Sequence, residues 1–326
     1  MARKALTQTQ LRLVQALEEV VPGVMAATGV QACRIGLSGG ADSLALTAAF
    51  AWARDRRQGY PLANVVITAR VVDHELQAGS GEVAAQAAQQ AAALGITAEV
   101  VRISVDADQG IGIEAAARAA RYQALREGEP TLIITGHTLD DQAETVLLGL
   151  ARGSGTRSLS GMAAARDHVV RPFLTMRRAD TEQACRDWGL VWWEDPTNRD
   201  PAYARSRLRR AMGLLDETLG PGLPEALART ADLCRQDADL LDSLALVGDP
   251  HLAPSLAIAP LAEMPPALRH RVILAWLRHH GSDPTRDHIL AVDALITDWR
   301  GQKAIQVPGG TVIRKADQLH LSRMRG

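Results

Sequence analysis

Apolar residues in the first half of the chain follow two alternating patterns. Short continuous runs, typical of strands buried on both faces of a sheet, lie at 32–38, 62–73, 97–105 and 131–137. Around them, apolar positions recur at helical spacing over 11–25, 42–56, 80–95, 112–127 and 139–153. Strands that alternate with helices indicate βαβ units. We therefore expect an α/β fold with a doubly wound, mostly parallel sheet covered by helices on both faces.

The pattern changes after about Leu215. A segment with Gly and Pro at 220–225 is followed by three helical stretches, at 223–244, 266–280 and 285–299. The end of the chain alternates around Pro308-Gly309-Gly310 like a small β-hairpin. We expect two domains, 1–215 and a smaller, mainly helical domain over 216–326 that ends in this hairpin.

Composition narrows the class of protein. Hydrophobic residues make up 47% of the chain and charged residues 22%, which is ordinary for a folded water-soluble protein. No apolar run approaches the roughly 20 residues that span a bilayer, and the first ten residues lack the layout of a secretion signal. The three cysteines are far apart, which argues against a disulfide framework, a zinc knuckle or a local redox motif. We expect a cytoplasmic protein.

Charge is unevenly distributed although the net charge is only -1. Residues 152–210 contain twelve arginines against seven acidic residues, whereas acidic residues are in excess before and after this segment. Arginine suits bidentate contacts to phosphate and stacking on bases. The segment indicates contact with nucleic acid, and a solvated surface is the alternative.

A glycine-rich loop, "GLSGGADS" at 36–43, joins an expected strand to an expected helix. Gly39 and Gly40 let backbone N–H groups approach an anion, and the start of the following helix favours negative charge. The loop has neither the lysine of a Walker motif nor a G-x-G-x-x-G pattern. Asp42 would repel phosphate unless a divalent cation lay between them, so the loop predicts a nucleotide with Mg²⁺. A simple helix cap is the alternative for Asp42.

Two more unusual segments, 71–75 and 135–141, also follow expected strands, so all three should meet at the carboxyl edge of the sheet, where such folds bind ligands. The second runs into an H-x-x-D-D-x-x-E pattern. Its members are His137, Asp140, Asp141 and Glu144. At helical spacing Asp140 and Glu144 share a face, as do His137 and Asp141. Clustered acids beside a phosphate site call for cations, and a well-capped, solvated helix start is the alternative.

The loop sequence "SGGADS" resembles the SGGxDS signature of the PP-loop family, which cleaves ATP between its α and β phosphates and adenylates an oxygen. Four further segments, at 72–80, 114–122, 136–155 and 192–210, together with "RPFL" at 171–174, are similar in order and spacing to the tRNA(Ile)-lysidine synthase family. The resemblance covers roughly 30–210, and the end of the chain resembles that family's middle domain more weakly. It matches the shorter members, which lack a further C-terminal domain.

This resemblance implies an adenine nucleotide α-hydrolase-like fold, with an ATP-binding catalytic domain over 1–215 and a tRNA-contacting domain over 216–326. It implies a ligase that uses ATP and Mg²⁺ to join free L-lysine to C2 of the wobble cytidine in the CAU anticodon of tRNA(Ile). The reaction passes through an adenylated tRNA, releases AMP and pyrophosphate, and lets the tRNA read AUA. The oligomeric state is left open, with a homodimer as one alternative.

The residues and the resemblance together suggest a set of site residues. Catalytic roles are expected for Asp42, Arg118, His137, Asp140, Asp141, Glu144 and Arg205. Contacts to the nucleotide are expected for Ser38, Gly39, Gly40, Ala41, Asp42, Ser43, Asp73, His74, Arg118 and Gly136. Mg²⁺ is expected at Asp42 and Asp140, and lysine at Asp141 and Glu144. Contacts to tRNA are expected for Arg152, Arg157, Tyr203, Arg205, Arg207, Arg209 and Arg210.

Each assignment has a structural alternative. Arg118 could lie over the alanines of its own helix, and Asp73 and His74 could simply end a buried strand. The tryptophans at 188, 192 and 193 could stack on bases, but core packing is the more usual role. The chain departs from the family at Gln77, Ser158 and Ser206, which puts peripheral contacts in doubt.

Two other classes of protein stay open. One is a different PP-loop enzyme such as a tRNA thiolase, although thiolases with an iron–sulfur cluster need paired cysteines that are missing here. The other is a non-catalytic module that binds nucleotide or tRNA. Clustered acids argue against that module, because a protein that only binds polyanions gains nothing from them.

Overall fold

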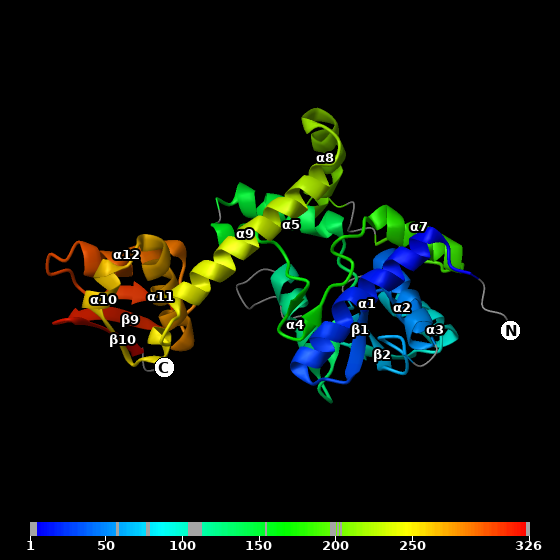
Figure 1. Cartoon of the computed structure of the whole chain (residues 1–326), viewed down its shortest axis with the longest axis horizontal. Coiled ribbons are helices and arrows are strands. Elements are labelled where there is room, and N and C mark those ends of the chain that lie inside the picture. The colour runs from blue at the N-terminus through cyan, green and yellow to red at the C-terminus, as the bar shows by residue number, and fades with distance from the viewer. Residues whose placement is uncertain are drawn as a thin grey trace. The chain divides into compact units, whose positions relative to one another are not determined.

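The computed structural model describes residues 5–56, 59–75, 79–103, 113–153, 155–195, 200, 202 and 204–323. The chain divides into two compact units, Met1–Asp232 and Leu233–Gly326 (Figure 1). The domain boundary expected after residue 215 falls inside helix α8 (Ala204–Leu219), and it stays a prediction.

The first unit contains the expected parallel sheet. Its strand order is β3-β2-β1-β4-β6-β5, and every neighbouring pair is parallel except β5 with β6. The strands are β1 (Ala32–Leu37), β2 (Val66–Asp73), β3 (Thr97–Arg102), β4 (Leu132–Ile134), β5 (Ala165–Arg166) and β6 (Val169–Val170). Both β5 and β6 have only two residues, which is too short for a periodic signal, so the sequence did not predict them. The α/β class and the mostly parallel sheet are confirmed.

Helices cover both faces of this sheet. The helices up to residue 219 are α1 (Gln8–Thr28), α2 (Ala41–Arg54), α3 (Ser80–Ala93), α4 (Ile113–Arg126), α5 (Leu139–Ala151), α6 (Thr156–Leu159), α7 (Arg178–Trp188) and α8, of which α8 packs on α5 rather than on the sheet. The helices α1, α2 and α7 pack on one another, and their apolar residues join Ile35 and Leu37 of β1 in the main core (Figure 1). On the other face, Leu125 of α4 packs with Ile133 and Val169.

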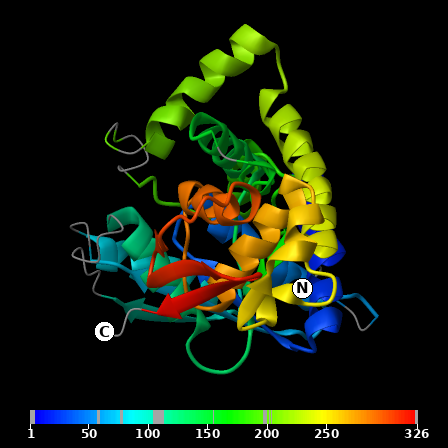
Figure 2. The same ribbon diagram turned by 90° about the vertical axis from the view of Figure 1, so that its left-hand side faces the viewer.

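The second unit begins within the long helix α9 (Leu223–Ala245) and continues through the short 3-10 helix η3 (Pro250–Leu252). Its other helices are α10 (Ile258–Glu263), α11 (Pro266–His279) and α12 (Arg286–Thr297). They pack with a four-stranded antiparallel sheet of order β7-β10-β9-β8, whose last strands are red in Figure 2. Fully buried Trp276 and Leu319 lie in this core.

The sheet of the second unit is larger than the expected hairpin. Pro308 and Gly309 join β8 (Ile305–Val307) to β9 (Gly310–Lys315), as the alternation predicts. Two further strands, β10 (Gln318–Arg323) and β7 (Ser255–Ala257), extend the pair. The β9–β10 turn places Ala316 at a positive φ of 51°, without the Gly or Asn that normally marks such a turn. The expectation of a mainly helical unit with one small hairpin therefore understated its sheet.

Candidate active site

The glycine-rich loop lies between the end of β1 and the start of α2. Gly39 has a φ of +82°, and a Cβ there would come within 3.2 Å of Val83 Cγ1. Both the backbone conformation and the lack of space therefore favour glycine at this position. Ser43, in the first turn of α2, accepts a hydrogen bond from the N–H of Ser38 (3.1 Å) and donates to the carbonyl of Gly40 (3.0 Å). The loop is thereby held in one turn at the N-terminus of α2, where the helix favours an anion.

The loop after β4 lies directly against this turn. A Cβ on Gly136 would be 2.7 Å from the carbonyl oxygen of Asp42 and 3.1 Å from the backbone nitrogen of Ser43. Since β1 and β4 are neighbours in the sheet while their chain connections diverge, the two loops meet at the point where the strand order reverses. Parallel sheets bind ligands at this point. The structure therefore brings the glycine-rich loop and the start of the acidic motif together.

The acidic motif forms the first turns of α5. Thr138 caps the helix, and Asp141 completes a capping box, since one of its carboxylate oxygens accepts hydrogen bonds from the Thr138 N–H (2.9 Å) and hydroxyl (3.0 Å). The other oxygen faces the guanidinium of Arg178 (2.9 Å). Glu144, one turn further along, is fully buried. The motif is therefore partly a helix start, as the structural alternative held, and partly a buried group of carboxylates.

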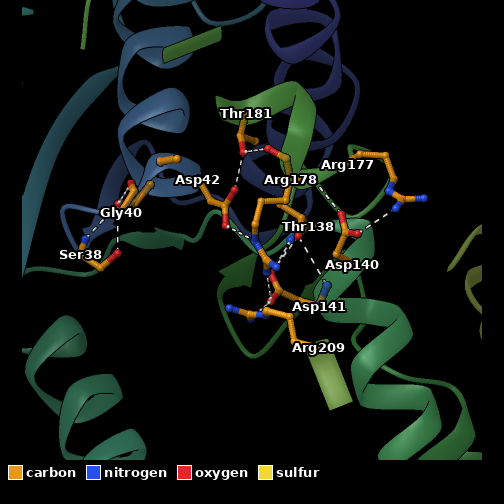
Figure 3. A network of polar contacts seen from close by, with 12 residues as sticks. Ser38, Gly40, Asp42, Thr138, Asp140, Asp141, Arg177, Arg178, Thr181 and Arg209 are labelled. Atoms are coloured by element: carbon orange, nitrogen blue, oxygen red, sulfur yellow. Dashed lines mark hydrogen bonds and ion pairs between the residues drawn. The ribbon is translucent and has the colours of Figure 1, made fainter. Parts of the chain in front are cut away.

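Arg178, at the start of α7, lies among these carboxylates (Figure 3). Its guanidinium nitrogens are 2.9 Å from Asp141 Oδ1, 3.5 Å from Asp42 Oδ2 and 3.8 Å from Glu144 Oε1. Sequence reasoning missed this residue. The only available signal was its place in an arginine-rich segment shortly after "RPFL", which does not distinguish it from its neighbours.

Asp140 contacts the beginning of α7. Its Oδ2 accepts a hydrogen bond from the backbone N–H of Arg178 (2.7 Å), and its Oδ1 forms an ion pair with Arg177 (3.1 Å). A carboxylate in this position satisfies one of the backbone donors that a helix leaves unpaired at its start. In the structure Asp140 thus links α5 to α7.

The charges around Asp42 are unbalanced. Burial, together with the nearby Asp141, raises the pKa of Asp42 to about 6, although Arg178 and the Thr181 hydroxyl act in the opposite direction. For Asp141, burial opposes ionisation, but Arg178, His137 and the Thr138 N–H outweigh it and lower its pKa. Of these two carboxylates, Asp42 is the one whose burial is not offset by positive charge, and a bound cation would supply that charge.

The two predicted Mg²⁺ ligands fit a metal unequally. Asp42 is a half-buried oxygen donor with a deficit of positive charge, which suits a hard divalent cation. Asp140 already uses one oxygen for the Arg178 N–H and the other for Arg177. No group of three His, Cys, Asp or Glu side chains is arranged to hold an ion within the part of the chain that the structure describes. The residues present fit a cation that Asp42 shares with the phosphates of a bound nucleotide.

The arginines of α8 divide between two sides of the helix. Arg209 Nε is 2.8 Å from Glu144 Oε1, and Arg205 lies 3.4 Å from the other carboxylate oxygen and also donates to Thr145 (3.0 Å). Arg207 and Arg210 are exposed, as are Arg152 and Arg157. Tyr203 lies outside the described residues. Arg205 and Arg209, both expected to bind tRNA, therefore contact α5 in this structure.

The remaining predicted site residues lie around the ends of β2 and β4. His137 is hydrogen-bonded through Nδ1 to the Thr135 hydroxyl (2.8 Å), and burial, helped by nearby arginines including Arg118, lowers its pKa to about 3. Its imidazole is neutral at pH 7, so it can take part in hydrogen bonds but is a weak base. Arg118 is exposed on α4 and stacks over Tyr122 at 5.2 Å.

Asp73 and His74 follow β2. Asp73 is buried and accepts a hydrogen bond from the Glu75 N–H (3.0 Å), while burial and the nearby Arg121 lower the pKa of His74. Both residues lie at the end of a buried strand and at the same edge of the sheet as the glycine-rich loop, a position that fits either interpretation, so their contact with the nucleotide stays a prediction.

The tryptophans at and after the end of α7 support the loop. Trp188 and Trp192 pack against the main core, in agreement with the core interpretation. The backbone N–H of Trp193 donates to the carbonyl of Gly39 (3.0 Å). This segment therefore steadies the loop from the side of α7.

The fold and the site define a PP-loop protein. Residues 6–214 match the family model described as a PP-loop domain, and residues 256–320 match the model described as a TilS substrate binding domain. The chain belongs to the tRNA(Ile)-lysidine synthase family. Relatives with that name include proteins of Leifsonia xyli subsp. xyli, 50% identical over 86% of each chain, and of Nocardia farcinica, 50% identical over 90% of this chain and 89% of the other.

A solved structure shows the same fold at low identity. The U34-tRNA thiolase NcsA of Methanococcus maripaludis, with its 4Fe-4S cluster, superposes with a TM-score of 0.55 and 16% identity over 70% of this chain and 79% of that one. Among the described residues, no helix is both long and apolar enough to cross a membrane.

Proposed function

We propose that the protein ligates free L-lysine to C2 of the wobble cytidine of a tRNA(Ile) with a CAU anticodon, using ATP and Mg²⁺. One observation carries the proposal: the glycine-rich loop and the acidic motif meet at the strand-order reversal, with Asp42 short of positive charge. Membership of the lysidine synthase family supports the choice of substrate. Since tRNA and ATP are its substrates, we also propose a cytoplasmic location.

The loop at 38–43 would hold the ATP phosphates at the N-terminus of α2. Mg²⁺, when bound, would neutralise phosphate charge, and Asp42 is the protein group best placed to share it. Ser38 and Ser43 add hydroxyls to the loop, and Gly136 keeps the neighbouring loop close. Arg118, exposed near His137, is a candidate for the phosphates or the adenylate.

Catalysis in this proposal depends on position and charge. Adenylation turns the C2 oxygen of the cytidine into a leaving group, and the lysine amine then attacks C2 and expels AMP. Asp141 and Glu144 supply carboxylates that can attract the lysine ammonium, although Arg178, Arg205 and Arg209 pair with them here. No covalent bond to the protein is required, so the main contributions are orientation and neutralisation of charge.

The exposed arginines at 152, 157, 207 and 210 and the second unit, which matches the substrate binding domain, would contact the tRNA. Each phosphate that an arginine neutralises releases counterions, so its loss weakens binding and reduces the salt dependence. Arg205 and Arg209 would act beside the reaction because they contact Glu144. A homodimer stays a prediction.

We expect Arg210→Gln to weaken tRNA binding and to lower the slope of log Kd against log salt concentration by about one. Filter binding of tRNA(Ile) between low and moderate salt measures this slope. Arg166→Gln is the matched control, because Arg166 is 70% exposed in the same arginine-rich segment but lies next to the β5–β6 turn, at the amino edge of the sheet. An unchanged slope in Arg210→Gln would show that Arg210 does not contact a phosphate of the tRNA.

Incubation of the protein with ATP, Mg²⁺ and radiolabelled lysine tests the function. We expect label to enter tRNA(Ile) with a CAU anticodon and not elongator tRNA(Met), with one AMP released per lysine. Release of AMP that depends on tRNA but incorporates no lysine would retain the PP-loop chemistry and reject lysidine synthesis. Tight binding of ATP and tRNA without any turnover would favour a binding module.

The cysteines argue against a thiolase. Burial raises the pKa of both Cys33 and Cys185 to about 12, and the Cys185 thiol donates to the carbonyl of Ala41. Thiols with such pKa values are poor nucleophiles and poor ligands at neutral pH. Sulfur transfer is therefore not supported by either residue.

A further inference from the structure

The first turn of α7 contacts both oxygens of Asp42. The hydroxyl of Thr181 is hydrogen-bonded to Asp42 Oδ1, and Arg178 Nε lies 3.5 Å from Oδ2. Figure 3 shows both side chains directed at the carboxylate. One oxygen thus has a neutral partner and the other a charged one, and both partners come from a helix 136 or more residues away in sequence.

These contacts determine how the carboxylate can turn. Two partners on different oxygens resist rotation about the Cβ–Cγ bond, whereas one partner would allow it. The backbone on both sides is also held, since α2 and α7 pack together and the Cys185 thiol donates to the Ala41 carbonyl (3.3 Å). Thr181 is fully buried, so water does not replace its hydroxyl readily.

The Thr181 hydroxyl has a second acceptor. Its oxygen is 2.7 Å from the carbonyl oxygen of Arg178 in the preceding turn. A hydroxyl has one proton and can rotate it between acceptors. If a cation takes Asp42 Oδ1, the proton can turn to this carbonyl, and no buried donor loses its hydrogen bond.

We propose that Thr181 is a positioning residue that holds Asp42 in the orientation needed for Mg²⁺–ATP and releases it at low cost when the cation binds. The inference rests on the proposed function. It concerns Thr181 rather than any residue of the glycine-rich loop or the acidic motif, and it does not require Thr181 to touch a substrate.

The test compares Thr181→Val, which keeps the shape and removes the hydroxyl, with Thr181→Ser, which keeps the hydroxyl. Calorimetry measures ATP binding in excess Mg²⁺ and in EDTA. We expect the Val variant to bind ATP about three- to tenfold more weakly in Mg²⁺ and equally well in EDTA, because the carboxylate must then be immobilised when the cation binds, at the cost typical of ordering one side chain. The Ser variant should bind within about twofold of wild type, and the KM for lysine should not change.

Thr47→Val is the matched control. Thr47 is also fully buried, and its hydroxyl donates to the carbonyl one turn earlier, at Ser43, but has no contact with Asp42. Should Thr181→Val not fold, Thr181→Ala removes the same hydroxyl. Equal losses of ATP binding with and without Mg²⁺, or no loss in Mg²⁺, would overturn the inference. Wild-type protein whose ATP binding ignores Mg²⁺ would instead defeat the proposed function.

Discussion

Asp42→Asn is expected to be more stable than the wild-type protein at pH 8 and to ligate lysine about 100- to 1,000-fold more slowly, the loss typical of removing one key electrostatic group. Asparagine resembles the protonated carboxyl in shape and still accepts a hydrogen bond from Thr181. It cannot supply the negative charge that a metal-bound nucleotide needs. Stability and activity should therefore change in opposite directions.

The sign of the stability effect follows from the raised pKa. Asp42 titrates near 3.8 in the unfolded chain and near 6 in the folded protein. Between these values the folded state binds more protons, so the free energy of unfolding falls as pH rises through this window and stays lower above it. The side chain is 25% exposed, so solvent screening reduces the effect, and the expected gain for Asp42→Asn at pH 8 is about 1–2 kcal/mol.

Urea unfolding at pH 8 and at pH 4 measures this effect, with the gain expected to vanish at the lower pH. Asp293→Asn is a control for which the opposite change in the free energy of unfolding is expected. Burial opposes ionisation of Asp293, but hydrogen bonds and charge from Arg269 and His270 outweigh it and lower its pKa, so its loss should destabilise the protein at pH 8. An Asp42→Asn variant less stable than wild type at pH 8 would contradict the charge imbalance inferred for the site.

Gly136→Ala is expected to lower the free energy of unfolding by about 2–3 kcal/mol and to remove most of the ligase activity. The added Cβ would be 2.7 Å from the Asp42 carbonyl oxygen and 2.8 Å from its carbonyl carbon. Backbone atoms cannot rotate away as a flexible side chain can, so the loop after β4 and the first turn of α2 must move apart. That movement displaces Asp42 and the glycine-rich loop together.

The measurements are urea unfolding and release of pyrophosphate from ATP in the presence of tRNA and lysine. Gly213→Ala, in helix α8, is the matched control, because a Cβ there meets nothing within 4 Å. It should stabilise the protein by up to about 1 kcal/mol through helix propensity. Wild-type stability and activity in Gly136→Ala would show that the two loops are not tightly packed in solution.

Local patterns were sufficient to predict the helices and strands up to the end of α5, whereas α6, α7 and α8 were not predicted. Each strand that the sequence predicted in this part of the chain is present, and each expected helix begins within about three residues of its predicted start. This succeeded because helices and buried strands impose different spacings on apolar residues. Strands of two or three residues, such as β5, β6 and β7, were missed because they are shorter than any repeat.

The position of the site was predictable for a similar reason. The carboxyl ends of parallel strands share one edge of the sheet, so the segments after β1, β2 and β4 had to lie near one another. The contacts within the site were not predictable. Asp140 meets the start of α7, and Arg178 reaches Asp42, Asp141 and Glu144, across separations of 34 to 136 residues that leave no local signature.

The arginines of α8 are a second case in which the sequence predicted the residues of the site but not their contacts. Arg205 and Arg209 lie one turn apart on α8 and so share a face. Their arginine-rich segment predicted contact with tRNA, but in the structure this face meets Glu144.

The sequence by itself determined the order of the main elements up to α5, the glycine-rich loop, the edge of the sheet where the candidate site forms and the family. These depend on spacing along the chain or on motifs of a few residues. Only the tertiary structure decided which arginine enters the group of carboxylates, which carboxylate is left short of positive charge, and which hydroxyl orients it. Those outcomes depend on burial and on distances between side chains from separate elements, because electrostatic energy in a folded protein depends on separation in space and on exclusion of water.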